Sequence, residues 1–308
     1  MQIFMKTLRT VTKKLFIPLS FLLRPAPVQH FLRKIGVSLP YFLAKQLNYK
    51  GVVDFTLDGK SLYMQSHNTP IEMTIFWKGL FNGREGAELR VWHQLSQKFS
   101  YIYDVGANNG IYSLVASTNQ TAKIFAFEPV PVVNEMLKEN IALNKLTSIT
   151  VQPEVVSDNN GRVTLFVPKT GWVDVASVNK DFATKHLRTE AMSEIECDSL
   201  TMDSHTETHL KDGEVVLMKI DVEGAEPKVL AGMKNLLSSN RVVGLIEILN
   251  QEAYDDFYNF MPSSYSIYGV IAVAPYLKSV NNFVPGIKNY IFVPQNQIEK
   301  LEIFTNAS

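Results

Sequence analysis

The chain has a single cysteine, no apolar run long enough to cross a membrane, and no acidic residue among its first fifty positions. One cysteine excludes an internal disulfide framework and predicts a reducing compartment, the cytoplasm. Cys197 stands between Glu196 and Asp198, and carboxylates beside a thiol raise its pKa. We therefore expect Cys197 to be inert rather than a nucleophile.

The start of the chain has neither the pattern of a membrane span nor that of a secretory leader. The apolar run over residues 15–23 is interrupted by Pro18 and is far shorter than the ~20 residues that a spanning helix needs. No small-x-small cleavage site follows it. With 46% hydrophobic and 19% charged residues, the composition excludes a disordered protein and is typical of a globular one.

The first fifty residues form a basic region that we expect to be helical. Its nine Lys or Arg residues are Lys6, Arg9, Lys13, Lys14, Arg24, Arg33, Lys34, Lys45 and Lys50. Two interpretations stay open. The region is either an amphipathic helix lying on an anionic membrane surface, which would make the protein peripheral at the inner membrane, or a packing arm whose basic side chains solvate its outer face.

The rest of the chain changes pattern near residue 100. Residues 51–100 predict a cap region, with a hairpin around an Asp58-Gly59 turn followed by a helix over residues 80–99. Over residues 101–308 strands alternate with helices, which predicts an α/β domain with a mostly parallel, seven-stranded sheet. The expected strands are 101–105, 123–127, 149–156, 215–220, 242–248, 265–273 and 289–293, with an added antiparallel strand at 162–167.

Acidic residues end or follow nearly every one of these strands, at Asp104, Glu128, Glu154, Asp221 and Glu247. Ligands of such sheets bind beyond the carboxyl ends of the strands. An acidic edge repels polyanions, so nucleic acid is excluded as a partner and a cationic or hydroxyl-rich ligand is favoured.

The loop after the first strand contains Gly106 and Gly110, which let the backbone approach a ligand closely. The third glycine of a dinucleotide fingerprint is missing, and Asp104 would stand where a pyrophosphate must lie. A carboxylate there suits the amino group of a methionine moiety better. Glu128, 24 positions later, is placed to accept hydrogen bonds from a ribose diol. An NAD(P)-dependent oxidoreductase remains the less favoured alternative.

His205-x-Glu207-x-His209 has two histidines four residues apart, but it lacks the order of a metalloprotease motif and an evident third ligand. We interpret it as a solvated loop.

Further motifs follow in a fixed order between about residues 100 and 250. They are residues 104–110 with Ser113, residues 127–131, residues 140–144, residues 156–161, residues 219–226 (KIDVEGAE), Val229-Leu230, Gly232 and Glu247. In these motifs the sequence resembles the FkbM family of methyltransferases.

The resemblance implies a Rossmann-like class I methyltransferase fold over residues 101–308, with S-adenosylmethionine as cofactor. It usually implies O-methylation of a hydroxyl on a sugar or glycan, a polyketide or another small molecule. The positions that would bind the cofactor are Asp104, Gly106, Asn108 and Gly110 for the methionine part, Glu128 for the ribose, and Glu154 with Val155 for the adenine. A non-catalytic protein that keeps the cofactor fold is a further alternative.

A hydroxyl acceptor needs its proton removed, and we expect the acids near the fourth strand to do this. Asp221 would point toward the donor methyl with Glu223 and Glu247 within reach, and Lys219 would neutralise a carboxylate. Alternatively, Lys219 and Glu226 only form an ion pair that fixes the turn. Oxygen ligands suit Mg²⁺, but clustered carboxylates also serve proton transfer alone, and no metal is predicted.

The resemblance to methyltransferases also suggests a role for the basic first fifty residues. We hypothesise that they hold the enzyme near a membrane-linked acceptor such as a glycolipid.

Overall fold

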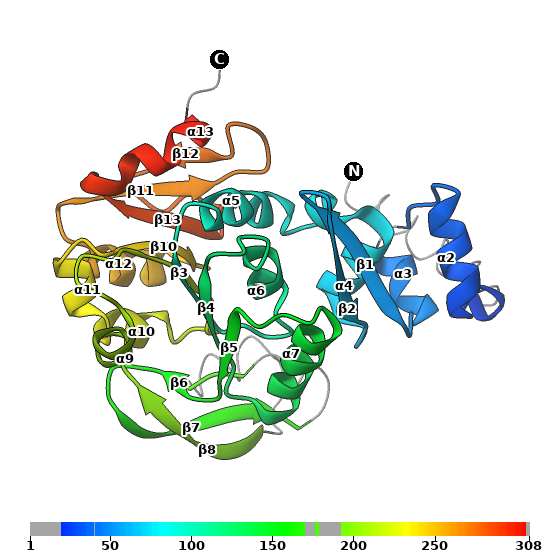
Figure 1. Cartoon of the computed structure of the whole chain (residues 1–308), viewed down its shortest axis with the longest axis horizontal. Helices are drawn as coiled ribbons and strands as arrows, with labels where there is room; N and C mark the ends of the chain where they lie inside the picture. The colour runs from blue at the N-terminus through cyan, green and yellow to red at the C-terminus, as the bar shows by residue number, and fades with distance from the viewer. Residues whose placement is uncertain (1–19, 40, 170–175, 179–191, 306–308) are drawn as a thin grey trace. The chain divides into compact units, whose positions relative to one another are not determined.

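The computed structural model describes residues 20–39, 41–169, 176–178 and 192–305 (Figure 1). The chain divides into two compact units, Met1–Gly86 and Ala87–Ser308. Among the described residues, no helix combines the length and the apolar character that crossing a bilayer requires. The three-part division with boundaries at residues 50 and 100 stays a prediction.

The first unit contains helices α2 (Ala26–Lys34), α3 (Tyr41–Leu47) and α4 (Pro70–Lys78), strands β1 (Val52–Leu57) and β2 (Lys60–Gln65), and the 3-10 helix η1 (Leu80–Asn82). β1 and β2 pair antiparallel around Asp58 and Gly59, so the predicted hairpin is confirmed. Both turn residues have positive φ, as a two-residue hairpin turn requires. The predicted helix over residues 80–99 is interrupted, because Gly83 ends η1 and three residues separate it from helix α5 (Gly86–Ser96).

The second unit is built on a sheet of eight described strands. They are β3 (Tyr101–Val105), β4 (Lys123–Phe127), β5 (Ile149–Gln152), β9 (Val216–Ile220), β10 (Val242–Glu247), β11 (Tyr265–Val270), β12 (Leu277–Ser279) and β13 (Asn289–Pro294). Their order across the sheet is β12-β11-β13-β10-β9-β3-β4-β5. The five strands from β10 to β5 are parallel.

The predicted Rossmann-like α/β fold with a mostly parallel sheet is therefore confirmed, although the sheet has one strand more than the seven expected. The extra strand, β12, has three residues and pairs only with β11 among the described strands, which is too short to leave a periodic pattern.

Helices cover both faces of this sheet. α9 (Met202–His209), α10 (Glu226–Ala231), α11 (Lys234–Ser238) and α12 (Gln251–Phe260) pack their apolar residues against alternate strand residues such as Tyr103, Met218 and Ile246. The residues between these, including Asp104 and Lys219, point to the opposite face, where α6 (Ile111–Ala116) lies. The structure also describes α7 (Pro131–Leu143), η2 (Gln295–Leu301) and α13 (Glu302–Thr305).

A second, three-stranded sheet contains β6 (Val155–Val156), β8 (Met192–Leu200) and β7 (Gly161–Pro168), in that order. Figure 1 shows β7 and β8 as a ribbon apart from the main sheet. The expected single strand over residues 149–156 is wrong, because β5 ends at Gln152 and β6 pairs with β8 instead. Pro153 explains the break, since proline cannot donate a ladder hydrogen bond.

The chain runs outward from β3 through β4 to β5, and in the other direction from β9 to β10. The strand order thus reverses between β3 and β9. This reversal leaves the carboxyl ends of these two strands open for a ligand.

Candidate functional site

The loop between β3 and α6 bends closely over the strand ends. Gly106, Asn108 and Gly110 have φ of 81°, 52° and 89°, in the left-handed region. The N–H groups of Gly106 and Ala107 donate to the Phe127 carbonyl at 3.1 and 2.9 Å, which ties the loop to the end of β4. A Cβ on Gly106 would lie 1.8 Å from the Asp221 carbonyl oxygen, so only glycine fits between β3 and β9.

Glu128 is buried where β4 ends, directly beside this loop. Its Oε2 accepts a hydrogen bond from Asn108 N–H at 2.9 Å, and its Oε1 accepts one from Val130 N–H at 2.9 Å. The two bonds orient the carboxylate. A carboxylate oriented at the end of this strand can accept hydrogen bonds from the two hydroxyls of a ribose.

Asp104 lies deeper, at the end of β3 under α6, with its Oδ2 accepting from Ser113 Oγ at 2.7 Å. Burial raises the pKa of Asp104, against the opposing effects of Lys219 and of the Ser113 hydrogen bond. The other carboxyl oxygen, Oδ1, is buried without a hydrogen-bond partner. An unpartnered acceptor beneath the glycine loop fits a cofactor that brings an ammonium group.

Lys219 lies beside Asp104 in the register of β9 on β3. Its Nζ donates to Asp221 Oδ2 at 2.9 Å and lies 4.4 Å from the centre of the Tyr112 ring. The buried ammonium thus faces two carboxylates and one aromatic ring. The structure places Lys219 and Asp221 as the two-residue spacing predicts.

The turn after β9 is held by another acid. Glu226 accepts hydrogen bonds from the N–H groups of Val222 at 3.0 Å and Gly224 at 3.3 Å. These bonds, rather than the ion pair with Lys219 considered as an alternative, fix the turn. Burial raises the pKa of Glu226 to about 7, although the backbone hydrogen bonds oppose the shift.

Glu247, at the end of β10, faces the other two acids of the predicted set. Burial raises its pKa to about 8, and the charges of Asp221 and Glu223 add to the shift. Lys288 and Lys219 lower it by less. A carboxyl group with such a pKa is suited to exchange a proton near neutral pH. Glu223 itself has a φ of 53°, and its carbonyl accepts from Ser177 Oγ at 2.7 Å.

The structure separates the two residues predicted to flank the adenine. Glu154 follows β5 and has one carboxyl oxygen buried without a hydrogen-bond partner. Val155 belongs to β6 and pairs with Ser199 in the small sheet. Of the two, Glu154 is the one at the edge of the main sheet.

Helix α7 supplies two residues that sequence reasoning did not assign to the site. Asn140 Nδ2 donates to the Asn109 carbonyl at 2.8 Å, and Asn134 Nδ2 donates to the Glu128 carbonyl at 2.6 Å. Both asparagines are buried. In the sequence, two asparagines on the otherwise apolar buried face of this helix could have indicated this role.

The His205 motif is not a solvated loop, so that interpretation is wrong. It lies on α9, with the His205 ring buried edge-on against Tyr103 and Phe125 and stacked on His209 at 4.0 Å. Burial lowers the pKa of His205 to about 4. Throughout the described ranges, no group of three or more His, Cys, Asp or Glu side chains is arranged to hold a metal ion.

Cys197 lies half-buried on β8, and burial followed by the charges of Glu196 and Asp198 raises its pKa. The direction expected from its neighbours is confirmed.

Comparison with known proteins identifies the sequence family of this site. Residues 104–272, more than half of the chain, match the family model described as "Methyltransferase FkbM domain". Methyltransferase sdnD of Sordaria araneosa is 29% identical over 155 residues, which are 43% of this chain and 60% of that protein. The chain therefore spans less than two thirds of the length of this relative.

The solved structures that this chain matches include methyltransferase FkbM from Methylobacillus flagellatus, with 16% identity and a TM-score of 0.40. The match covers 72% of this chain and 54% of that one. A SAM-dependent O-methyltransferase from Thermotoga maritima matches with 10% identity and a TM-score of 0.38, over 81% of this chain and 80% of the other.

Proposed function

The chain belongs to the FkbM family of S-adenosylmethionine-dependent methyltransferases, and from this premise we propose that it methylates a hydroxyl oxygen of a small acceptor. A sugar, a glycolipid or a polyketide-like molecule is the acceptor class we propose. The family match favours a methyltransferase over the oxidoreductase and the non-catalytic alternatives.

One observation carries the proposal: the glycine loop with its buried acids and an acid of raised pKa lie at neighbouring strand ends. The glycine loop and Glu128 lie at the ends of β3 and β4. Asp221 and Glu247 lie at the ends of β9 and β10, the next strands across the same sheet. Parallel strands present their carboxyl ends at one edge, so a donor and an acceptor bound there would be adjacent.

S-adenosylmethionine supplies an activated methyl group on a sulfonium when it is bound. We assign the ribose hydroxyls to the Glu128 carboxylate and the methionine part to the loop of Gly106, Asn108 and Gly110. Asp104 completes this set from below, since its free Oδ1 requires a donor. The adenine is assigned to the side of Glu154, and the role of Val155 is limited to shaping the wall behind it.

The acceptor hydroxyl must lose its proton as the new bond forms, and Glu247 is the residue we assign as the base. Its raised pKa makes the ionised carboxylate a stronger base than an ordinary glutamate. Asp221 forms a 2.9 Å ion pair with Lys219 and would orient the hydroxyl. We assign Glu223 to the same cluster of acids. The larger part of the acceleration would come from alignment of the reactants.

The test begins with the cofactor and ends with the acceptor. Calorimetry of the full chain with S-adenosylmethionine, and separately with NADH, should give binding of the first alone. Incubation with a methyl-labelled donor and a panel of free sugars, glycolipids and phenols should then transfer the label to a hydroxyl. Transfer to amines but not to hydroxyls would contradict the O-methylation, and binding of NADH in place of S-adenosylmethionine would contradict the whole assignment.

A further inference from the structure

The first unit exposes large apolar side chains on the outer side of its N-terminal helices. In α2, Phe31 is 60% exposed and Ile35, directly after the helix, is 58% exposed. The helical residues just before it add Phe21 and Leu22, also exposed. Phe31 and Ile35 are four residues apart and so are neighbours on one helix face.

The opposite side of α2 is anchored to its own unit. Gln29 is buried and donates to the carbonyls of Arg24 and Leu47 at 2.8 and 3.4 Å. Arg33 donates to the Asp54 carboxylate at 2.6 Å and to its carbonyl at 2.8 Å. The orientation of α2 is thus fixed by the fold, and Phe31 and Ile35 face outward as a consequence.

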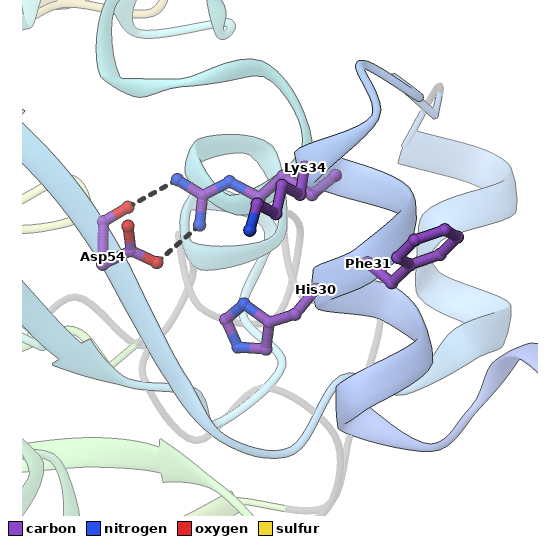
Figure 2. Close-up of a pocket in the computed structure, with 5 residues that line it drawn as sticks. His30, Phe31, Lys34 and Asp54 are labelled. Carbon is purple, nitrogen blue, oxygen red and sulfur yellow. Dashed lines mark hydrogen bonds and ion pairs between the residues drawn. The ribbon is translucent and has the colours of Figure 1, made fainter.

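A pocket of about 480 Å³ opens beside this face, lined by His30, Phe31, Arg33, Lys34 and Asp54. Figure 2 shows His30 and Lys34 extending toward the strand that carries Asp54, whereas Phe31 points away from it. Because Asp54 is engaged by Arg33, the exposed ammonium of Lys34 is the charge offered to a ligand in this pocket. This charge favours an anionic ligand.

The charge of the unit agrees with such a ligand. Residues 1–86 contain twelve Lys or Arg and four Asp or Glu, and no acid precedes Asp54. Since the whole chain has no net charge, residues 87–308 are acidic by the same amount. An anionic surface would attract the first unit and repel the second.

We propose that α2 is a peripheral docking surface for an anionic lipid membrane. Phe31 and Ile35 insert among the lipids together with Phe21 and Leu22, and a lipid phosphate binds beside Lys34. Apolar insertion combined with basic contacts is how amphipathic helices bind anionic membranes. This docking is independent of the methyl transfer proposed above, because it rests on the first unit alone.

The test is co-sedimentation of the full chain with vesicles of phosphatidylcholine alone and of phosphatidylcholine with about 30 mol% phosphatidylserine. We expect binding only to the anionic vesicles, with loss of binding in about 0.5 M salt. The double substitution F31S/I35S should weaken binding about tenfold. Lys34→Glu should weaken it severalfold.

Matched controls lie in the second unit. V273S/I303S removes two apolar side chains of similar exposure, 68% and 55%, and Lys228→Glu reverses the charge of another exposed lysine. Both controls should bind as the native chain does. The proposal is overturned if the native chain binds neutral and anionic vesicles equally or not at all, or if the controls lose as much binding as the α2 variants. It is also overturned if F31S/I35S, with an unchanged melting temperature, binds like the native chain, or if it only abolishes self-association.

Discussion

Glu128 is the residue on which cofactor binding depends most directly. Charge-assisted hydrogen bonds contribute about 1.5–3 kcal/mol each, so Glu128→Gln, which keeps the shape but loses the charge, should weaken S-adenosylmethionine binding about 10- to 100-fold. Calorimetry measures this change. Glu135→Gln on α7 is the control, because Glu135 is exposed and its carboxylate forms a 2.8 Å ion pair with Lys138 on the same helix. Equal affinities of E128Q and E135Q would refute the ribose assignment.

Glu247 predicts a dependence of methyl transfer on pH. The carboxyl group must be ionised to accept a proton, and its pKa is about 8. The rate should therefore rise about tenfold per pH unit below pH 8 and level off above it, since each unit changes the ionised fraction tenfold. Glu247→Gln should lower the rate about 100-fold and abolish the pH dependence, while leaving the affinity for S-adenosylmethionine unchanged.

The raised pKa of Glu247 also affects the stability of the protein when no methyl acceptor is present. Between pH 4.5 and about 8 the folded protein keeps a proton on Glu247 that the unfolded chain has lost. Stability must then fall as the pH rises through this window. In urea unfolding, the free energy of unfolding of E247Q should increase relative to that of the native protein from pH 5 to pH 9. If the two free energies change in parallel over that range, the pKa of Glu247 is ordinary.

At the scale of elements, the packing of the β3 loop against the end of β9 depends on Gly106. An alanine there would combine a positive φ with a Cβ 1.8 Å from the Asp221 carbonyl oxygen. Gly213 has nearly the same φ, 79°, with no atom within 4 Å of its Cβ position, so Gly213→Ala isolates the backbone strain. We expect G213A to cost about 1 kcal/mol and G106A at least about 2 kcal/mol more, measured by urea unfolding. Only G106A should also lose cofactor affinity. Equal costs would show that the loop adapts without strain.

Helix α9 predicts a second pH effect of opposite sign. His205 is held neutral among aromatic rings with a pKa of about 4, against 6.5 in an unfolded chain. As the pH falls from 6.5 to 4, His205 is protonated in the unfolded state but stays neutral in the folded state, so the free energy of unfolding falls. His205→Phe should reduce this acid sensitivity, as read from melting temperatures at pH 4.5 and 6. Above pH 7 the two proteins should show the same slope, because His205 is then neutral in both states.

The elements that sequence patterns predicted are those whose pattern is local. The buried strands β3, β4 and β9 are short runs of apolar residues, and the acids that end them follow directly in the chain. β8 had a usable signal too, because exposed Glu194, Glu196 and Asp198 alternate with half-buried residues at the period of a strand. β8 was not predicted, because its composition is mostly polar.

What local patterns could not predict depends on contacts between distant positions. Asn140 reaches a carbonyl 31 residues away, and only the packing of α7 over the loop brings them together. The pKa of Glu247 likewise depends on Asp221 and Glu223, which lie in the turn after β9, far from Glu247 in the sequence. Gly232, at the end of α10, packs so closely against another segment that a Cβ there would lie 2.0 Å from the Ser157 carbonyl oxygen.

At the scale of the whole molecule, the proposed cofactor site lies entirely within the second unit, while the first has a buried core of its own around Val53, Leu62 and Phe76. Ligand binding stabilises what it binds by mass action, by about 2.7 kcal/mol at a concentration 100 times Kd. S-adenosylmethionine should therefore slow hydrogen exchange in peptides covering β3, β4 and β9 about 100-fold. The hairpin β1–β2 should exchange as before. Equal protection of the hairpin would mean that the two units open as one cooperative structure, and protection confined to the hairpin would place the cofactor in the wrong unit.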